Sequence, residues 1–136
     1  GERLELIGRA PRRGHAIEVR INAEDPARGF VPTPGLVTRF RPPLGAGTRV
    51  DTAMREASEI PPYYDSLVAK VIVSHSTRAL AIARARRALS ELEVEGIATT
   101  RNLALALLDT EEFRSGDYST STLRDLEGRV PSLAPA

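Results

Sequence analysis

The sequence predicts an α+β fold in which an antiparallel sheet is followed by helices near the C-terminus. The length of 136 residues suits one domain. The strand-like segments precede the helix-like ones, which favours antiparallel pairing over an alternating β–α–β order. Internal repeats are not visible. We expect an irregular linker over 1–13, the domain over 14–127 and a flexible tail over 128–136.

The first predicted strand, His15–Asn22, alternates cleanly between apolar and polar side chains. Its apolar positions are Ile17, Val19 and Ile21, and its polar positions are Glu18, Arg20 and Asn22. A loop with turns is expected over 25–35, which holds three prolines and two glycines. The segments 36–40 and 48–51 predict a hairpin-like pair around a wide Pro/Gly turn.

A further short strand is expected over 54–60. The apolar, β-branched run 67–73 fits a central strand covered on both faces, apart from Lys70. A helix capped by Ser76 or Thr77 should continue to about residue 93, with Ile82, Ala85, Leu89 and Leu92 along its inner stripe. A second helix is expected from residue 99 or 100, with Leu103, Ala106 and Leu107 inward, and shorter helical turns over 110–116 and 121–126.

Composition and charge exclude several classes of function. The chain contains no Cys, which rules out disulfides and thiolate metal sites. The formal net charge of +1 is too small for the phosphate contacts of a typical nucleic-acid domain. Neither a membrane-spanning segment nor a secretory signal is visible. We therefore expect a cytoplasmic globular piece.

Residue spacing leaves the candidate chemistry open. Glu18 and Arg20 can form ion pairs on a solvated face, or Arg20 can direct its fork of donors at an anion. Asp65, in the turn 61–66, can bind its own backbone or orient a cationic side chain. Lys70 needs a partner or a route to water, and a structural lysine that reaches solvent is the default interpretation.

Several segments together resemble the C-terminal domain of biotin carboxylase, and they do so in order. The run 14–26 (GHAIEVRINAEDP) is similar to the opening strand of that domain. The resemblance continues through the segments 32–35, 47–51, 61–67, 81–82, 88–89 and 94–99 and covers about residues 14–123. The version Ile21–Asp25 (INAED) looks more like acyl-CoA carboxylases than pyruvate carboxylase.

The resemblance implies a domain of rudimentary single-hybrid-like architecture from an ATP-dependent ligase of the ATP-grasp family. Such enzymes join bicarbonate and ATP into carboxyphosphate and then carboxylate a ureido nitrogen of biotin on a carrier protein. ATP and Mg²⁺ or Mn²⁺ would be bound mainly by domains absent from this chain, to which residues 1–13 would connect. The chain alone would be inactive and would hold no cofactor or metal. The parent would be an acetyl- or propionyl-CoA carboxylase of fatty acid biosynthesis.

By the same resemblance, Arg20 matches the catalytic arginine that contacts bicarbonate and biotin and stabilises the ureido enolate. Asp65 matches an acidic residue near that site and is hypothesised to orient Arg20, with Glu18 a weaker candidate for the same network. Arg49 matches a position near the family's dimer interface. The implied partners are the ATP-grasp domains, the biotin carboxyl carrier domain, a carboxyltransferase subunit and a second copy of the parent.

The sequence departs from the family pattern at two places. Ala46 stands where some relatives carry an aromatic residue, and 99–103 (TTRNL) lacks the usual Thr-Asn pairing, with expected consequences for packing rather than catalysis. Two other classes stay open: another ATP-grasp carboxylase or ligase with a related C-terminal domain, and a stand-alone interaction module without catalysis.

Overall fold

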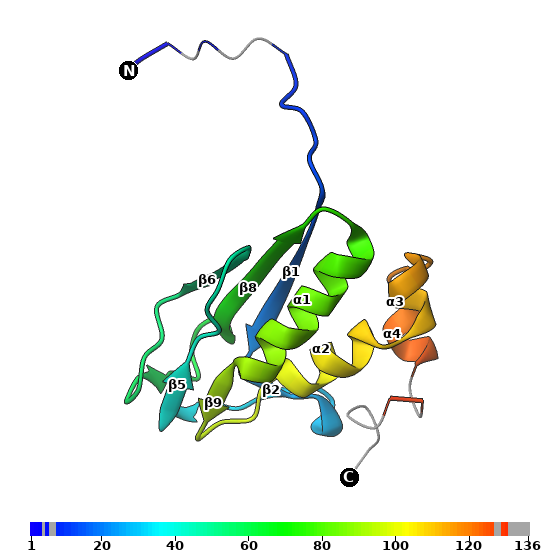
Figure 1. Cartoon of the computed structure of the whole chain (residues 1–136). Helices are drawn as coiled ribbons and strands as arrows, with labels where there is room; N and C mark the ends of the chain where they lie inside the picture. Colours follow the sequence, from blue (N-terminus) through cyan, green and yellow to red (C-terminus); the bar gives the residue numbers. More distant parts are fainter. Residues whose placement is uncertain (4, 6–7, 127–128, 131–136) are drawn as a thin grey trace.

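A computed structural model describes residues 1–3, 5, 8–126 and 129–130, and it confirms the predicted α+β class. Its main sheet is antiparallel and has the order β1-β8-β6 (Figure 1). These strands are β1 (His15–Asn22), β8 (Leu67–His75) and β6 (Thr48–Thr52). Strand β1 is therefore an edge strand, and the apolar β8 is central, as its sequence predicted. The expectation that both faces of β8 are covered is wrong, because Ile72 as well as Lys70 is only partly buried on one face.

Three small antiparallel pairs surround this sheet. They are β2 (Glu24–Asp25) with β3 (Val31–Pro32), β4 (Gly35–Leu36) with β7 (Glu59–Ile60), and β5 (Arg39–Arg41) with β9 (Glu93–Glu95). The segment expected to be only a loop over 25–35 thus contains two short strands and the 3₁₀ helix η1 (Pro26–Arg28). Of the strand expected over 54–60, only β7 forms.

The expected hairpin between 36–40 and 48–51 is wrong. Strand β5 pairs with β9, more than fifty residues later, and β6 pairs with β8. The Pro/Gly segment between β5 and β6 is too wide to act as a tight turn, so each strand takes a partner from elsewhere. Arg39 also forms an ion pair with Glu93 across the β5–β9 pair, which favours that register.

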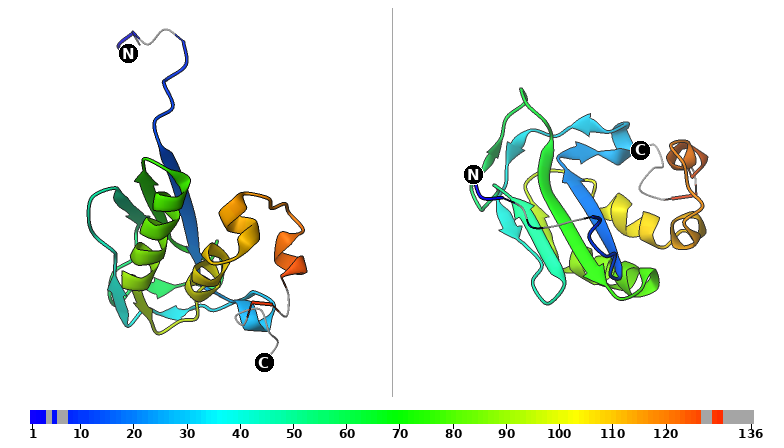
Figure 2. Two further views of the ribbon diagram at one scale, coloured as in Figure 1. Left: turned by 45° about the vertical axis from the view of Figure 1, so that its right-hand side comes forward. Right: turned by 90° about the horizontal axis from the view of Figure 1, so that it is seen from above.

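Helix α1 (Arg78–Glu91) packs on one face of the main sheet, against β8 and β1 (Figure 2). Its start is confirmed: Thr77 is the N-cap, and its side chain accepts a hydrogen bond from the Leu80 N–H at 3.3 Å. Its buried positions are Ala81, Ala85, Ala88 and Leu89. Ile82, expected on the inner stripe, is only partly buried, because alanines occupy the line of closest approach to the sheet.

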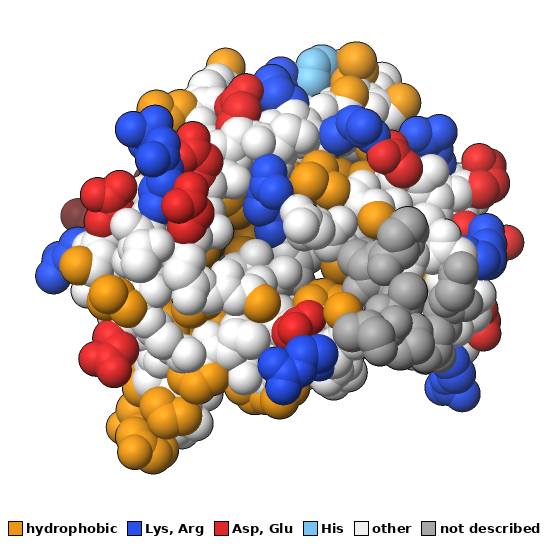
Figure 3. Space-filling view, turned by 90° about the horizontal axis from the view of Figure 1, so that it is seen from below, with side chains coloured by type: hydrophobic (Ala, Val, Ile, Leu, Met, Phe, Trp, Pro, Cys, Tyr) orange, Lys and Arg blue, Asp and Glu red, His pale blue; other side chains and the backbone are white. Residues whose placement is uncertain are grey.

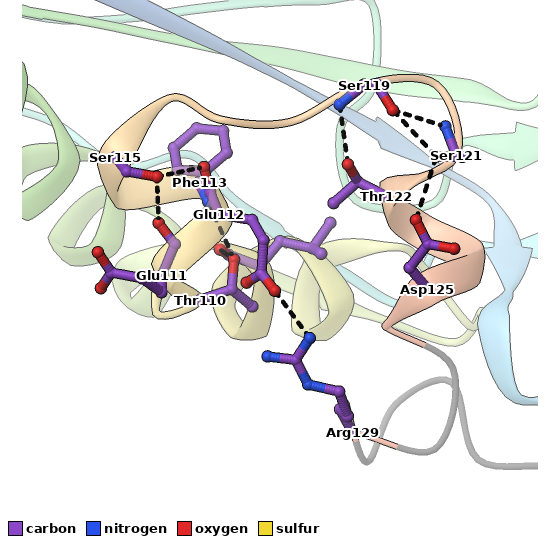
Figure 4. A network of polar contacts seen from close by, with 11 residues as sticks. Thr110, Glu111, Glu112, Phe113, Ser115, Ser119, Ser121, Thr122, Asp125 and Arg129 are labelled. Atoms are coloured by element: carbon purple, nitrogen blue, oxygen red, sulfur yellow. Dashed lines mark hydrogen bonds and ion pairs between the residues drawn. The ribbon is translucent and has the colours of Figure 1, made fainter.

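Three further helices follow. Helix α2 (Arg101–Leu108) lies beside β1, and α3 (Glu111–Ser115) and α4 (Thr122–Asp125) lie beyond α2 (Figure 2). The inward residues of α2 are Leu103 and Leu108, whereas Ala106 and Leu107, expected inward, are partly buried. Side-chain hydrogen bonds stabilise the ends of α3 and α4 (Figure 4). The Arg129 guanidinium also donates to Glu112 Oε1 at 2.7 Å.

The two ends of the chain differ in how they relate to the domain. The described residues before Gly14 form no regular element and lead away from the fold (Figure 1). Within the expected tail, Val130 is buried beside Leu126 and Leu103. Residues 128 and 131–136 of that expected tail, and residue 127 at the end of the expected domain, lie outside the described residues.

Candidate functional site

The face of the main sheet opposite α1 carries a row of charged side chains. Alternation along the strands turns Val19, Val71 and Val50 toward the core and places their neighbours on the open face. Arg20 of β1 lies directly opposite Lys70 of β8, which in turn lies opposite Asp51 of β6. This row brings together side chains from three segments that are far apart in the sequence.

A second row on the same face joins Glu18, Ile72 and Arg49 in register. Arg49 forms two hydrogen bonds to Asp51, from Nε to Oδ1 at 2.7 Å and from Nη2 to Oδ2 at 2.9 Å. The hydrogen bond from Arg49 lowers the pKa of the Asp51 carboxyl below its ordinary value, and the charge of Lys70 contributes less. Glu18 and Arg20 share a face, as the alternation of β1 predicted, and Arg49 lies on the same face two strands away.

Arg20 is exposed and stands on a well-anchored segment of backbone. Its side chain forms no ion pair or hydrogen bond with the described residues. Thr100 anchors the backbone of this segment: its Oγ1 accepts from the Asn22 N–H at 3.0 Å and donates to the Arg20 carbonyl at 3.3 Å. The Thr100 N–H also donates to the Asn22 carbonyl at 3.1 Å. The guanidinium therefore projects from a fixed edge strand.

Asp65 occupies the exposed turn between β7 and β8. Its Oδ1 accepts a hydrogen bond from the Leu67 N–H at 2.7 Å, which is the local backbone role considered for it. The described part of the chain shows no ion pair between Asp65 and Arg20. The role of Asp65 as an orienting residue for Arg20 stays a prediction. The two preceding residues, Tyr63 and Tyr64, are exposed by 85% and 83%.

Sequence reasoning missed a polar cluster at the end of β1. Glu24 Oε1 accepts hydrogen bonds from the Ser66 hydroxyl and from Asn22 Nδ2, the latter at 3.2 Å. The Oδ1 atom of Asn22 is buried and has no partner among the described residues. Glu24 and Ser66 lie 42 positions apart, so no local spacing could have revealed the cluster.

A mostly apolar groove of about 560 Å³ lies between the free edge of β1 and the layer of α2, α3 and α4. Glu18 and Arg20 stand among its lining residues, together with apolar side chains such as Val19, Leu107 and Phe113. Seen from below, the surface of the domain mixes charged side chains with small hydrophobic patches and hollows (Figure 3).

The described residues contain neither a cluster of metal-ligating side chains nor a membrane-spanning helix. In that part of the chain no three His, Cys, Asp or Glu side chains gather to hold a metal ion. None of the helices there has both the length and the apolar composition to cross a bilayer. The charged groups on the open face are guanidinium, ammonium and carboxylate groups.

The molecule is a small α+β domain with an open sheet face that carries charged side chains of both signs. The family model for the biotin carboxylase C-terminal domain matches residues 18–125. The chain belongs to that family. The resemblance of the sequence motifs is thereby confirmed, together with the fold it implied.

Curated relatives and solved structures agree with this assignment. The chain is 53% identical over 110 residues to biotin carboxylase 1 of Bacillus subtilis, covering 81% of this chain and 24% of the relative. It is 54% identical over 99 residues to the alpha3 subunit of a biotin-dependent acyl-coenzyme A carboxylase of Mycobacterium leprae, covering 73% and 17%. The biotin carboxylase domain dimer of the Hydrogenobacter thermophilus 2-oxoglutarate carboxylase, solved with MgADP, ADP and bicarbonate, superposes with a TM-score of 0.90 at 41% identity, covering 93% and 28%.

The chain thus spans about a quarter of the length of most relatives that it matches. Those relatives include acyl-CoA, pyruvate and 2-oxoglutarate carboxylases. The finer expectation of an acetyl- or propionyl-CoA carboxylase is not separated from these others by the comparisons.

Proposed function

We propose that this chain completes the active site of a biotin carboxylase, in which ATP and bicarbonate are used to carboxylate biotin on a carrier domain. The observation that carries the proposal is Arg20, a guanidinium exposed on a fixed edge strand without a carboxylate partner among the described residues. Family membership supports the same conclusion. ATP and its Mg²⁺ or Mn²⁺ would be held mainly by the preceding ATP-grasp domains, so the isolated chain would not turn over.

The chemistry of biotin explains why a fixed guanidinium is useful at this position. Negative charge develops on the ureido oxygen when the neighbouring nitrogen becomes nucleophilic. Arg20 stays protonated at any working pH, and its fork of donors can stabilise that oxygen. Loss of one such preorganised donor typically costs about 3–4 kcal/mol of transition-state stabilisation. We further propose Asp65 as a positioning residue for Arg20, with Glu18 in a lesser role.

Biotin-dependent ATP cleavage by the full-length protein tests this proposal, with free biotin and bicarbonate supplied. Arg20→Ala should lower kcat by about 100-fold or more with the KM for ATP unchanged. Arg124→Ala is the matched control, because Arg124 is exposed on α4 and its side chain makes no contact with the charged rows. Wild-type turnover in Arg20→Ala would refute the catalytic role. A normal pH–rate profile and kcat in Asp65→Asn would refute the positioning role.

The proposed parent is an acetyl- or propionyl-CoA carboxylase. Its support is the INAED version of residues 21–25 and the similarity to an acyl-coenzyme A carboxylase subunit. The partners would then be the carrier domain and a carboxyltransferase subunit in the cytoplasm. Transfer of labelled bicarbonate by the complete enzyme to acetyl-CoA, propionyl-CoA, pyruvate or 2-oxoglutarate decides the acceptor, and labelling of either oxo acid alone would overturn this assignment.

We also propose that Arg49 lies at a homodimer contact of the parent. Its side chain is 73% exposed and is held in place by Asp51, so it presents a fixed guanidinium face at the sheet edge formed by β6. A related biotin carboxylase domain was solved as a dimer. Arg49→Glu should shift the full-length protein toward monomer in analytical ultracentrifugation, and an unchanged sedimentation coefficient would exclude the contact.

A further inference from the structure

The polar cluster at the end of β1 connects the two segments that carry Arg20 and Asp65. Its centre is Glu24 Oε1, which accepts hydrogen bonds from the Ser66 hydroxyl and from Asn22 Nδ2. Asn22 lies two residues after Arg20 on β1. Ser66 directly follows Asp65 in the turn between β7 and β8. A single carboxylate oxygen therefore joins the Arg20 segment to the turn of Asp65.

The backbone pairing of β1 with β8 is interrupted at this cluster. The register shifts between Ile21 and Asn22, so that one residue of β8 is left without a partner. A shift of this kind disrupts the ladder locally and re-aims the side chains beyond it. Beyond the shift, the Ala23 N–H donates to the Ser66 carbonyl at 2.7 Å. The ladder therefore places the turn less firmly than it places the uninterrupted part of β1.

The turn has few other supports. Residues 61–65 are exposed. Among the described residues, the turn makes hydrogen bonds to other segments only through Ser66. The bond from the Leu67 N–H to Asp65 Oδ1 is local. A pocket of about 270 Å³, lined partly by Glu24, lies between the turn and the β2–β3 pair. The turn can thus shift toward or away from β1 unless its contact with Glu24 holds it.

A carboxylate is well suited to hold two segments together in this way. When ionised it only accepts hydrogen bonds, so it fixes the direction of both the hydroxyl and the amide donor. Hydrogen bonds to an ionised group are also shorter and about twice as strong as those between neutral groups. Glu24, Asn22 and Ser66 are all half-buried, which strengthens their contacts relative to those of an exposed cluster.

We propose that Glu24 and Ser66 form a latch that positions the turn of Asp65 against the Arg20 segment for the carboxylation reaction. Both are positioning residues, because they act through Asp65 and need not touch a substrate. This inference rests on the proposed function, in which Asp65 orients Arg20, and it names the residues that keep Asp65 in place. Loss of the Glu24–Ser66 latch should lower kcat and leave the KM for ATP unchanged, since ATP would be held mainly by the preceding domains.

Steady-state kinetics of the full-length protein test the latch through kcat for biotin-dependent ATP cleavage. Ser66→Ala removes the hydroxyl and should lower kcat by about tenfold, with the KM for ATP changed by less than about twofold. Ser66→Thr keeps a hydroxyl and should restore kcat to within about threefold of wild type. Ser90→Ala is the matched control, because it removes an exposed hydroxyl on α1 that donates to the Arg86 carbonyl at 2.9 Å.

A double variant separates positioning from a general loss of structure. Because the latch acts through Asp65, Ser66→Ala should lower kcat by less than about twofold in an Asp65→Asn background. A loss in that background as large as in the wild-type background would show that Ser66 acts by another route, and it would overturn the proposal.

Amide hydrogen exchange reports whether the contact is lost where the structure places it. The Ala23 amide should exchange faster in Ser66→Ala than in wild type or Ser66→Thr, because its acceptor is the Ser66 carbonyl. Equal exchange in the three proteins would contradict the latch. Wild-type turnover in Ser66→Ala, with turnover still lost in Arg20→Ala, refutes the latch and leaves the proposed function intact. Normal turnover in Arg20→Ala instead refutes the proposed function itself.

Discussion

Replacement of Thr100 by valine should loosen β1 at the position of Arg20. Valine keeps the shape of the side chain but removes both hydrogen bonds of the hydroxyl, at 3.0 Å to the Asn22 N–H and at 3.3 Å to the Arg20 carbonyl. The bond from the Thr100 N–H to the Asn22 carbonyl stays, so the segment remains attached at one point. The main loss is an acceptor for a half-buried N–H, worth about 1–2 kcal/mol.

Amide hydrogen exchange in the full-length protein measures this loss where it occurs. Because about 1.4 kcal/mol corresponds to a factor of ten, the Asn22 amide should exchange about 5-fold to 30-fold faster in Thr100→Val. Turnover should fall in parallel, since Arg20 is held less firmly. Thr99→Val is the matched control: it makes the same chemical change one residue earlier, where the hydroxyl accepts only a long bond of 3.4 Å from the Arg101 N–H. Equal exchange of the Asn22 amide in the two variants would refute the anchoring role.

Three further predictions concern stability. Gly96→Ala should lower the free energy of unfolding by about 3 kcal/mol, because a Cβ there would lie 2.2 Å from a carbonyl oxygen of β4. Gly29→Ala is the control: open space surrounds that position, so the substitution should cost only about 1 kcal/mol. Thermal unfolding of the two variants measures the difference. Arg101→Met should speed amide exchange in the last turn of α1, since its guanidinium donates at 2.7 and 3.0 Å to the last carbonyls of that helix, and unaltered protection there would exclude this role. Hydrogen bonding from Arg86 lowers the pKa of the Asp109 carboxyl below its ordinary 3.8. The ionised carboxylate therefore stabilises the folded protein above pH 3.8, and this contribution is lost as the pH falls through the lowered pKa of the folded state. Asp109→Asn should therefore be less stable than wild type at neutral pH and equal to it in acid, and a deficit that persists in acid would contradict this assignment.

Local pattern was enough to predict the elements whose formation depends on neighbouring residues. The alternation over 15–22 gave both the extent of β1 and the shared face of Glu18 and Arg20, because strand periodicity is a property of the backbone alone. Thr77 was confirmed as the start of α1 for a similar reason, since its side chain caps an N–H three residues away.

Pairing between distant segments could not be predicted in this way. The choice of β9 over β6 as partner of β5 depends on cross-strand contacts such as that between Arg39 and Glu93, which are 54 positions apart. The same holds for Thr100 beneath Arg20 and for the clustering of Glu24 with Ser66. Candidate site residues were found where the motif was contiguous, and their supporting contacts were missed where the chain had to fold back.

The departure at 99–103 now has a physical account. Arg101 stands within that departure, and its guanidinium binds the carbonyls of Leu89 and Ser90 at the end of α1. Its neighbour Thr100 is the residue that anchors the Arg20 segment. The turn therefore fixes the end of α1 and the end of β1 at the same point, which couples the packing of the helix layer to the position of the candidate catalytic side chain.

The spread of relatives bears on the step of catalysis that this domain would serve under the proposed function. Carboxylases named for acyl-CoA, pyruvate and 2-oxoglutarate all match this chain at between 42% and 54% identity. A domain that chose among such different acceptors would need a pocket adapted to each of them. The open face instead presents charged side chains, among them the exposed Arg20, and under the proposed function this guanidinium serves bicarbonate and biotin, which are common to all of these reactions. Under the proposed function, Arg20 serves the carboxylation of biotin that these carboxylases share, and the acceptor would be selected on another part of the enzyme.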